Sequence, residues 1–205
     1  MLNEKGKDGA MNRRRFLQSI MTVGVGLVIF PHAAKAAWQT DTGLQGVVIR
    51  PTNLDFGPLE NRCVTDAIIV HHVGNTNADV SAATMHEWHK ANGWSGIGYH
   101  FVIRKDGTIE AGRPMDTVGA HCKGENTHTI GINIVGNFET AWPEDAQLAS
   151  AVKLIPAICR NYGFAPSAST IFGHRDFNAT LCPGENLYGL LPNLIERCNK
   201  NYIGG

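Results

Sequence analysis

The sequence has 205 residues, of which 43% are hydrophobic and 18% are charged, and it contains no internal repeat or low-complexity tract. These proportions are typical of one folded domain and argue against long disordered segments. The 18 basic and 18 acidic residues balance. The chain therefore lacks the excess of positive charge that nucleic-acid-binding proteins concentrate on their surface, and we expect no nucleic-acid partner.

The first 36 residues have the order of an export signal. Three arginines, Arg13-Arg14-Arg15, precede an apolar run that is shorter than the roughly 20 residues of a membrane span. Ala34-Lys35-Ala36 then offers a cleavage point. Paired arginines before Phe-Leu and a glycine-containing apolar run resemble a twin-arginine signal, which implies export of a folded protein to the periplasm or the extracellular space.

This signal divides the chain into three parts. We predict the export signal over residues 1–36, an N-terminal arm over 37–63 and one folded domain over 64–205. After cleavage no membrane span is expected to remain, and the rest of the chain has 12 basic and 16 acidic residues, a formal charge of −4. A retained N-terminal anchor is the alternative.

All five cysteines lie after residue 36. They are Cys63, Cys122, Cys159, Cys182 and Cys198. An odd number leaves at least one thiol without a disulfide partner in the same chain. If Cys182 binds a metal ion, the other four allow two disulfides in three connectivities, between which the sequence does not choose.

The hydrophobic pattern predicts strands and helices in a mixed order. Residues 38–62 form an extended arm with one short strand, and the run Ala67-Ile68-Ile69-Val70 forms a buried central strand. A helix follows over 79–92, with Asp79 as its N-cap. A hairpin then turns at Lys105-Asp106-Gly107, where the glycine supplies a positive φ.

The second half of the domain continues this alternation. The pattern predicts a strand over 129–135, a helix that begins at Pro143, a short strand over 169–172 and a last helix over 187–198. Pro156 is expected to kink or interrupt its helix. The predicted fold class is therefore α/β, a single domain with a central mixed β-sheet flanked by helices.

Three side chains could hold a metal ion. His71 ends the buried strand, His174 follows a second strand, and Cys182 lies in a loop before the last helix. Three protein ligands with an open fourth position describe a catalytic zinc site, and imidazole and thiolate are ligands that suit zinc. The spacing of His174 and Cys182 alone is a weak signal, because loops bring many such pairs together.

Six short motifs occur in a fixed order around these residues. They are Ile68-Ile69-Val70-His71-His72, Gly98-Tyr99-His100-Phe101, Asp106-Gly107-Thr108-Ile109-Glu110-Ala111-Gly112-Arg113, Val118-Gly119-Ala120-His121, Gly173-His174-Arg175-Asp176 and Cys182-Pro183-Gly184. Together they resemble the phage-lysozyme-type amidases and the peptidoglycan recognition proteins over roughly residues 64–198. Six motifs in register are far more specific than any one of them.

The resemblance implies a zinc-dependent N-acetylmuramoyl-L-alanine amidase domain in which His71, His174 and Cys182 hold Zn²⁺. An activated water would attack the amide between N-acetylmuramic acid and L-alanine in peptidoglycan or a muropeptide. Tyr99 matches the catalytic tyrosine of the family, whose hydroxyl can stabilise the water or the developing oxyanion. Thr180 matches the recognition proteins that cleave, whereas phage enzymes often have lysine there. We expect a monomer, since the sequence has no wall-binding repeat.

Three further residues are candidate substrate contacts. His121 lies in a loop motif, where it contacts substrate or supports the loop. Arg113 binds a peptide carboxylate or is a solvated arginine at a strand end. Trp94 lines a sugar groove, whereas Trp88, at helical spacing, is expected in the core.

Other polar residues of the motifs are expected to be structural. His72 and His100 follow His71 and Tyr99, which take the side of each strand that faces the site. Glu110 is the nearest carboxylate of the motifs, but the alternation of its strand can turn it away from the site, so we do not assign it as a base.

Two alternatives to a zinc amidase are open. A non-catalytic recognition module would bind peptidoglycan without cutting it, but such relatives typically lack the cysteine ligand that this chain keeps. Cys182 with His174 could instead form a nucleophilic Cys/His pair. The third ligand, His71, and the neighbouring Tyr99 favour hydrolysis with a metal.

Overall fold

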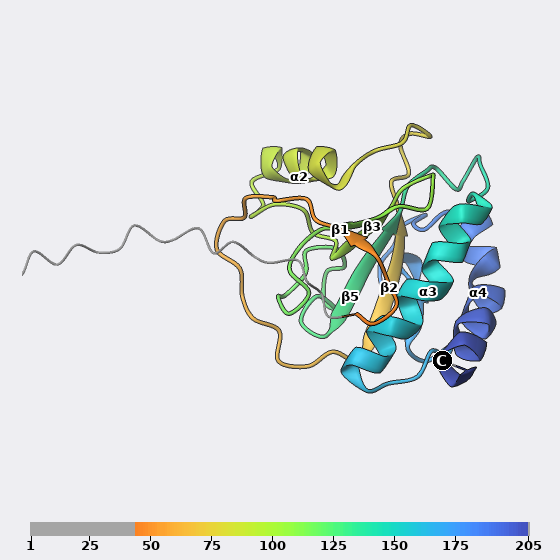
Figure 1. The fold of residues 1–205 in the computed structure, drawn as a ribbon. Helices are drawn as coiled ribbons and strands as arrows, with labels where there is room; N and C mark the ends of the chain where they lie inside the picture. The colour runs from red at the N-terminus through yellow and green to blue at the C-terminus, as the bar shows by residue number, and fades with distance from the viewer. Residues whose placement is uncertain (1–43, 205) are drawn as a thin grey trace, which may run out of the picture. The chain divides into compact units, whose positions relative to one another are not determined.

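The computed structural model describes residues 44–204, which belong to one compact unit of the chain, Trp38–Gly205. These residues form a six-stranded sheet with helices on both faces (Figure 1). The predicted α/β fold with a mixed sheet flanked by helices is therefore confirmed. The export signal predicted over residues 1–36 lies outside the described residues and stays a prediction.

Short strands make up the sheet. They are β1 (Ile49–Arg50), β2 (Ala67–His72), β3 (Phe101–Ile103), β4 (Ile109–Ala111), β5 (Thr129–Ile134) and β6 (Ile171–Gly173). Their order is β1-β4-β3-β5-β2-β6, and only β3 and β4 pair antiparallel. The β3–β4 hairpin turns at Gly107, whose φ of +84° is the positive value predicted from the sequence. The N-terminal arm contributes β1 to the same sheet.

β2 and β5 lie at the centre of the sheet. Every residue of both strands is buried, and their β-branched side chains suit a strand that is covered on both faces. The two strands pair in register, which places His71 beside Asn133. On its other edge β2 pairs with β6, up to Val70 beside Gly173. Three parallel strands therefore end close together at one edge of the sheet.

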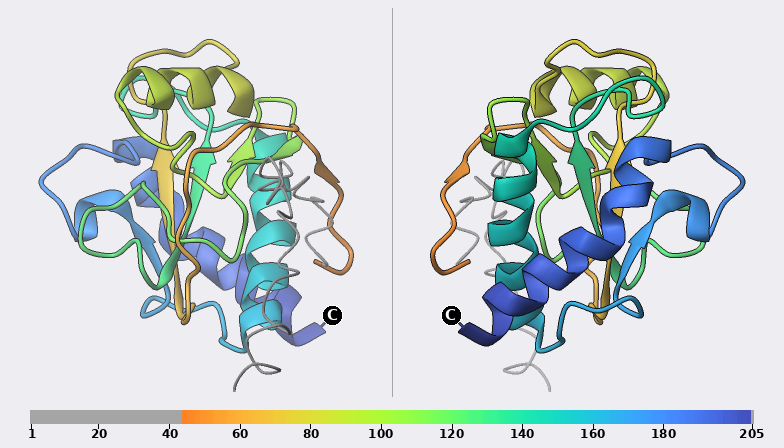
Figure 2. Two further views of the ribbon diagram at one scale, coloured as in Figure 1. Left: turned by 90° about the vertical axis from the view of Figure 1, so that its left-hand side faces the viewer. Right: turned by 90° about the vertical axis from the view of Figure 1, so that its right-hand side faces the viewer.

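The helices cover both faces of the sheet. Figure 2 shows α2 (Ala82–Ala91) on one face, and α3 (Asp145–Tyr162) and α4 (Glu185–Gly204) on the other. The larger core lies under α3 and α4, and a smaller core around Met85 and Val102 lies under α2. None of the helices within residues 44–204 combines the length and the apolar composition of a membrane span.

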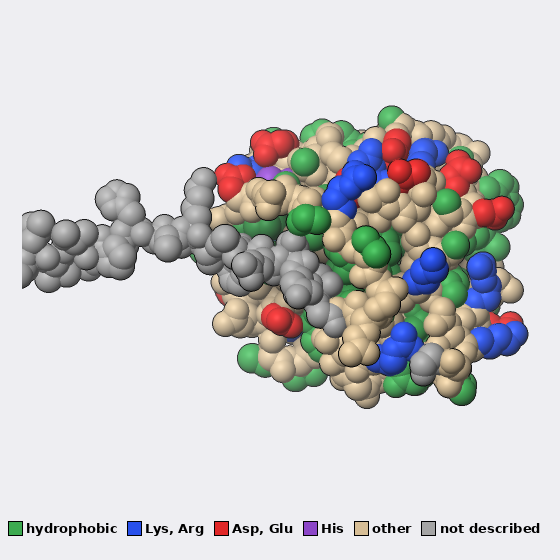
Figure 3. Space-filling view, in the orientation of Figure 1, with side chains coloured by type: hydrophobic (Ala, Val, Ile, Leu, Met, Phe, Trp, Pro, Cys, Tyr) green, Lys and Arg blue, Asp and Glu red, His purple; other side chains and the backbone are tan. Residues whose placement is uncertain are grey.

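The start of α2 differs from the prediction. Ser81 is the N-cap, and its hydroxyl accepts a hydrogen bond from the backbone N–H of Thr84 at 3.1 Å. Asp79 is not the cap because its carboxylate forms an ion pair with Arg104 at 2.8 Å. Figure 3 shows acidic and basic side chains next to one another along the upper part of the face that it presents.

Two prolines lie inside helices. α3 continues through Pro156, so the predicted interruption is wrong, and the alternative of a kink stays a prediction. Pro156 is buried together with Leu154 and Ile155, and this packing offsets the hydrogen bond that proline cannot donate. α4 likewise contains Pro192 and is longer at both ends than the predicted helix over 187–198.

The cysteines form no disulfide. Cys63 is exposed, Cys122, Cys159 and Cys198 are buried, Cys182 is partly buried, and all five are free. The two disulfides that the cysteine count allowed are therefore absent. Cys159 and Cys198 belong to the larger core, where they act as small apolar side chains.

A charged cluster joins the starts of β2 and β5. The half-buried ring of His128 lies between two carboxylates, with Nδ1 2.6 Å from Asp66 Oδ1 and Nε2 2.9 Å from Glu125 Oε2. Hydrogen bonding to Asp66, supported by Glu125, raises the pKa of His128 above its ordinary value of 6.5. Both ring nitrogens then donate, and the imidazolium is the favoured form.

This cluster makes stability depend on pH. A folded pKa above the unfolded one stabilises the protein fully below about pH 6.5, and the contribution is lost as pH rises through the folded pKa. We expect His128→Gln to lower the melting temperature more at about pH 6 than at about pH 8.5. Thermal unfolding of both proteins at the two pH values checks this, and an equal loss at both would contradict a charged His128.

Candidate active site

The three predicted metal ligands converge at the edge where the parallel strands end. His71 is the next-to-last residue of β2, His174 begins the 3-10 helix η1 (His174–Asp176) directly after β6, and Cys182 lies in the loop before α4. One ligand atom from each lies within 4.8 Å of the others. The Sγ of Cys182 is 3.6 Å from Nδ1 of His71, and the two histidine rings have centroids 4.6 Å apart. Side chains from distant parts of the sequence thus form one cluster.

Hydrogen bonds behind His71 select its tautomer. Its Nε2 lies 3.1 Å from Nδ1 of His121, and Nε2 of His121 lies 3.4 Å from Oγ1 of Thr129. The Thr129 hydroxyl donates to the carbonyl of Glu125 at 2.7 Å. Because the Thr129 hydroxyl donates its own hydrogen to Glu125, it accepts from Nε2 of His121, and Nδ1 of His121 in turn accepts from His71. His71 therefore carries its proton on Nε2. The lone pair of Nδ1 then faces Cys182, as metal binding requires.

Two glycines make room for the ring of His121. A Cβ at Gly119 or at Gly131 would lie 2.5 Å from an atom of this ring, a distance that no side chain tolerates. His121 is consequently buried between two stretches of backbone. Both of its ring nitrogens face protein groups, so the structure places it behind His71, a candidate metal ligand, rather than in an open cleft.

A similar contact orients His174. Its Nε2 lies 3.1 Å from Oδ1 of Asn178, and Nδ2 of Asn178 donates to the carbonyl of Lys123 at 3.2 Å. The amide is therefore held with its oxygen toward His174, which leaves Nδ1 of His174 free for an ion. No sequence motif marks Asn178; its position four residues after His174 is the one available signal.

The loop that carries Cys182 is fixed by its neighbours. The backbone N–H of Arg175 donates to the carbonyl of Cys182 at 2.9 Å, and Nη1 of Arg175 pairs with Glu185 at 2.7 Å. The hydroxyl of Thr180 accepts from the N–H of Cys182 at 3.2 Å, which leaves its hydrogen free to donate. The N–H of His72 points at Sγ of Cys182 from 3.4 Å.

The protonation of the three ligands suits a metal such as zinc. Burial lowers the pKa of His71 and of His174, so both imidazoles are neutral and offer a lone pair. Burial raises the pKa of the Cys182 thiol to about 12. A nearby cation is therefore needed to hold it as thiolate. Two imidazoles and one such thiol fit zinc rather than calcium or magnesium.

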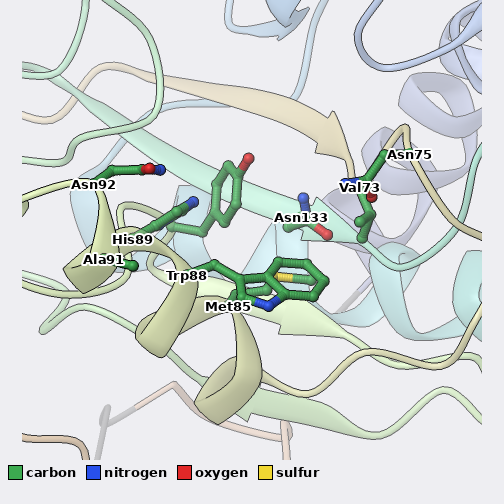
Figure 4. A pocket seen from close by; sticks show the side chains of 9 residues that line it. Val73, Asn75, Met85, Trp88, His89, Ala91, Asn92 and Asn133 are labelled. Carbon is green, nitrogen blue, oxygen red and sulfur yellow. The ribbon is translucent and has the colours of Figure 1, made fainter.

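A cavity of about 520 Å³ opens beside the ligands. It is lined by Val73, Asn75, Met85, Trp88, His89, Ala91, Asn92, Tyr99 and Asn133, most of which Figure 4 labels. The ring of Tyr99 lies 5.1 Å from that of His71, between centroids. Trp88 is 42% exposed, so its predicted place in the core is wrong. Its helix turns it toward the cavity instead.

Two other predicted substrate contacts lie outside this lining. Trp94 is 45% exposed and packs on His89, with ring centroids 4.7 Å apart, so it extends the aromatic surface of the cavity. Arg113 is only 7% exposed, and its guanidinium donates to the carbonyls of Ile97 and Val118, both at 2.9 Å. The interpretation of Arg113 as a solvated arginine is wrong, because it ties loops together from within.

The histidines expected to be structural have protein partners. Nδ1 of His72 accepts from the N–H of Phe138 at 3.1 Å. Nδ1 of His100 accepts from the N–H of Gly131, and its Nε2 lies 3.0 Å from the carbonyl of Thr117. The structural interpretation of His72 and His100 is therefore confirmed.

Glu110 points away from the ligands. One carboxylate oxygen accepts from the backbone N–H of Ala82 at 2.7 Å, and the other pairs with Arg104 at 2.9 Å. The carboxylate thus stabilises the N-terminus of α2, where the helix dipole favours negative charge. Its place in a motif reflects this structural contact.

Comparison with known proteins agrees with this geometry. A family model described as N-acetylmuramoyl-L-alanine amidase matches residues 61–185. The endolysin of Enterobacteria phage K11 is 38% identical over 128 residues, which cover 60% of this chain and 83% of the endolysin.

Solved structures share the fold. The endolysin N-acetylmuramoyl-L-alanine amidase LysCS from Clostridium intestinale matches with a TM-score of 0.66 and 34% identity, over 73% of this chain and 95% of that one. Drosophila PGRP-LB matches with a TM-score of 0.63 and 25% identity, over 70% and 91% of the two chains. The chain described here belongs to the N-acetylmuramoyl-L-alanine amidase family.

Proposed function

We propose that this protein is a zinc-dependent amidase that hydrolyses the bond between N-acetylmuramic acid and L-alanine in peptidoglycan or its muropeptide fragments. The observation that carries the proposal is the convergence of His71, His174 and Cys182 next to Tyr99 and an open cavity. Membership of the amidase family supports the same reaction.

The ligand set defines what the metal site contributes. His71 and His174, each through Nδ1, and the thiolate of Cys182 would hold the ion. When bound, zinc supplies Lewis acidity, which activates water as a nucleophile at neutral pH and polarises a carbonyl group. His121 and Asn178 hold the two imidazoles in the tautomer that this binding needs.

Two hydroxyl groups, those of Tyr99 and Thr180, are our candidates for stabilising the transition state. Burial raises the pKa of Tyr99 far above its ordinary value, so its hydroxyl keeps its proton and can donate to the oxyanion of the attacked amide. The hydroxyl of Thr180 is fixed by the N–H of Cys182 and has a hydrogen available for the same purpose. Both groups are neutral, so neither replaces the charge of an ammonium group.

The cavity is suited to a glycopeptide. Trp88 and Trp94 offer exposed aromatic faces for the apolar face of a sugar, and Asn75 and Asn92 add polar groups at the rim. His121 contacts the ring of His71, and Arg113 donates hydrogen bonds to the loop carbonyls of Ile97 and Val118. Neither side chain lines the cavity itself. We therefore assign these two residues supporting roles instead of direct substrate contacts.

A cysteine nucleophile is a weaker explanation of the same cluster. A Cys/His pair works through a thiolate with a lowered pKa. Burial raises the pKa of Cys182 instead, and Nε2 of His174 is directed at Asn178. Metal hydrolysis uses all three residues and leaves none without a role.

We also propose where the protein acts. Arg13-Arg14-Arg15, the apolar run and Ala34-Lys35-Ala36 support export in the folded state, and therefore action on the wall from outside the cytoplasm. The proposal includes a monomer, as expected from a sequence without a wall-binding repeat.

Product analysis tests the reaction. We expect the purified protein to release stem peptides that begin with free L-alanine from peptidoglycan, as identified by mass spectrometry. Chelation or Cys182→Ala should abolish release, because either one removes the metal site. Cys63→Ala, at an exposed and free cysteine, is the matched control and should release peptides at the wild-type rate. Wall binding without release by the zinc-loaded protein would instead indicate a recognition module.

The role of Tyr99 separates catalysis from metal binding. We expect Tyr99→Phe to lower kcat by about 10²–10³-fold, since one oxyanion donor is lost. Zinc affinity should not change, because the hydroxyl is not a ligand. Steady-state kinetics and zinc titration measure both, and a kcat like that of the wild type would remove Tyr99 from the mechanism.

The support of His71 by His121 has its own measurable effect. His121→Ala should weaken zinc binding by about 10–100-fold, as measured by competition with a chelator, because the ring of His71 loses its orienting partner. Cys63→Ala, at an exposed and free cysteine, is the control and should bind zinc like the wild type. Equal zinc affinity of both variants would show that His121 does not orient the ligand.

A further inference from the structure

Asn133 in β5 is a buried polar residue without partners. It is 0% exposed, and neither its amide nitrogen nor its amide oxygen has a hydrogen bond. Within residues 44–204, Nε of Arg175 is the one other buried side-chain nitrogen or oxygen in this condition. Asn133 is thus the one described side chain whose donor and acceptor groups are both buried and unused.

The position of Asn133 connects it to the active site. It pairs with His71 of β2 in the parallel register and with Val102 of β3 on its other side. Figure 4 shows its amide projecting from β5 toward the space between Val73 and Trp88. Both of these residues line the cavity, as does Asn133 itself. The unused amide therefore belongs to the wall of the cavity, next to the metal ligands.

An unpaired buried amide is costly to the folded protein. A polar group that loses water and gains no partner destabilises the fold, and an apolar side chain of similar shape would be more stable there. Such a group is retained where a partner arrives during function, as in sites that trade stability for activity. The hydroxyl of Tyr99, just before β3, is near enough to Asn133 to affect its own pKa, but it forms no hydrogen bond of ordinary geometry with this amide. β2 and β3 supply no other partner, which leaves the contents of the cavity.

We propose that Asn133 hydrogen-bonds a peptide group of the stem peptide, next to the bond that is cut. This inference rests on the proposed amidase function. A carboxamide offers one acceptor and a donor in one plane, which matches the N–H and C=O of a secondary amide. Because water is excluded from the amide, these hydrogen bonds form without competition from solvent, and a ligand that lacks the peptide group leaves the amide unpaired.

Binding without turnover tests the proposal. The parent protein carries Cys182→Ala, and the probe is N-acetylmuramoyl-L-alanyl-D-isoglutamine, titrated by calorimetry. Addition of Asn133→Leu should weaken binding by about tenfold or more. The same substitution should raise the melting temperature by about 2–4 °C, because the unpaired amide is gone. Asn133→Ala, which avoids any steric effect of leucine, should weaken binding to a similar degree.

Two controls separate this role from a structural one. Asn201→Leu makes the same chemical change at an exposed position of α4, and should leave affinity unchanged. N-acetylmuramic acid alone, without a peptide group, should bind Asn133→Leu as well as it binds the parent. Equal loss for the sugar alone would overturn the assignment to a peptide group.

The remaining outcomes are also decisive. Unchanged affinity of both Asn133 variants for the glycopeptide would overturn the proposal. If the same substitutions in the active enzyme lowered kcat but left affinity unchanged, the proposal would also be wrong. The proposed function is judged separately, by release of stem peptides from peptidoglycan by the wild type. If the wild type neither cleaves the wall nor binds the glycopeptide, both proposals fail.

Discussion

The parallel pairing of β2 with β5 and β6 is the constraint on which the rest of the site depends. Parallel strands end at a common edge, so residues that follow them meet even when they are far apart in the sequence. His71 and His174 are brought together in this way, and the loop with Cys182 returns to the same edge. Burial of both faces of β2 fixes the register, since a slip of one residue would exchange His71 with His72.

Hydrogen bonds then determine what the gathered side chains can do. In water the neutral rings of His71 and His174 could each carry the proton on either nitrogen, but His121 and Asn178 occupy one nitrogen of each ring. The same edge of the sheet leaves the amide of Asn133 without a partner. Hydrogen-bonded partners thus fix the rings of the two candidate ligands, whereas the amide of Asn133 in the cavity wall stays unpaired, as the proposed metal site and substrate contact require.

Local chemistry made part of this predictable. The β-branched run before His71, the turn at Gly107 and the three candidate ligands that cluster in the fold were predictable, because ligand types and turn residues have strong local signatures. The exposure of Trp88 could not be predicted, because helical spacing does not say how closely a helix packs on its sheet. The N-cap of α2 could not be predicted either, because the sequence does not show that Arg104 pairs with Asp79. The unpaired amide of Asn133 could not be predicted either, because the sequence shows only one polar residue within an apolar strand.

The absence of disulfides has a consequence for where this protein can mature. Its fold is closed by apolar cores and buried hydrogen bonds, and its cysteines contribute no covalent link. Folding therefore needs no oxidant and can be completed in a reducing compartment. A thiol ligand such as Cys182 is also kept available for metal there, instead of being captured by another cysteine. The fold and its free cysteines are thus compatible with the proposed export in the folded state.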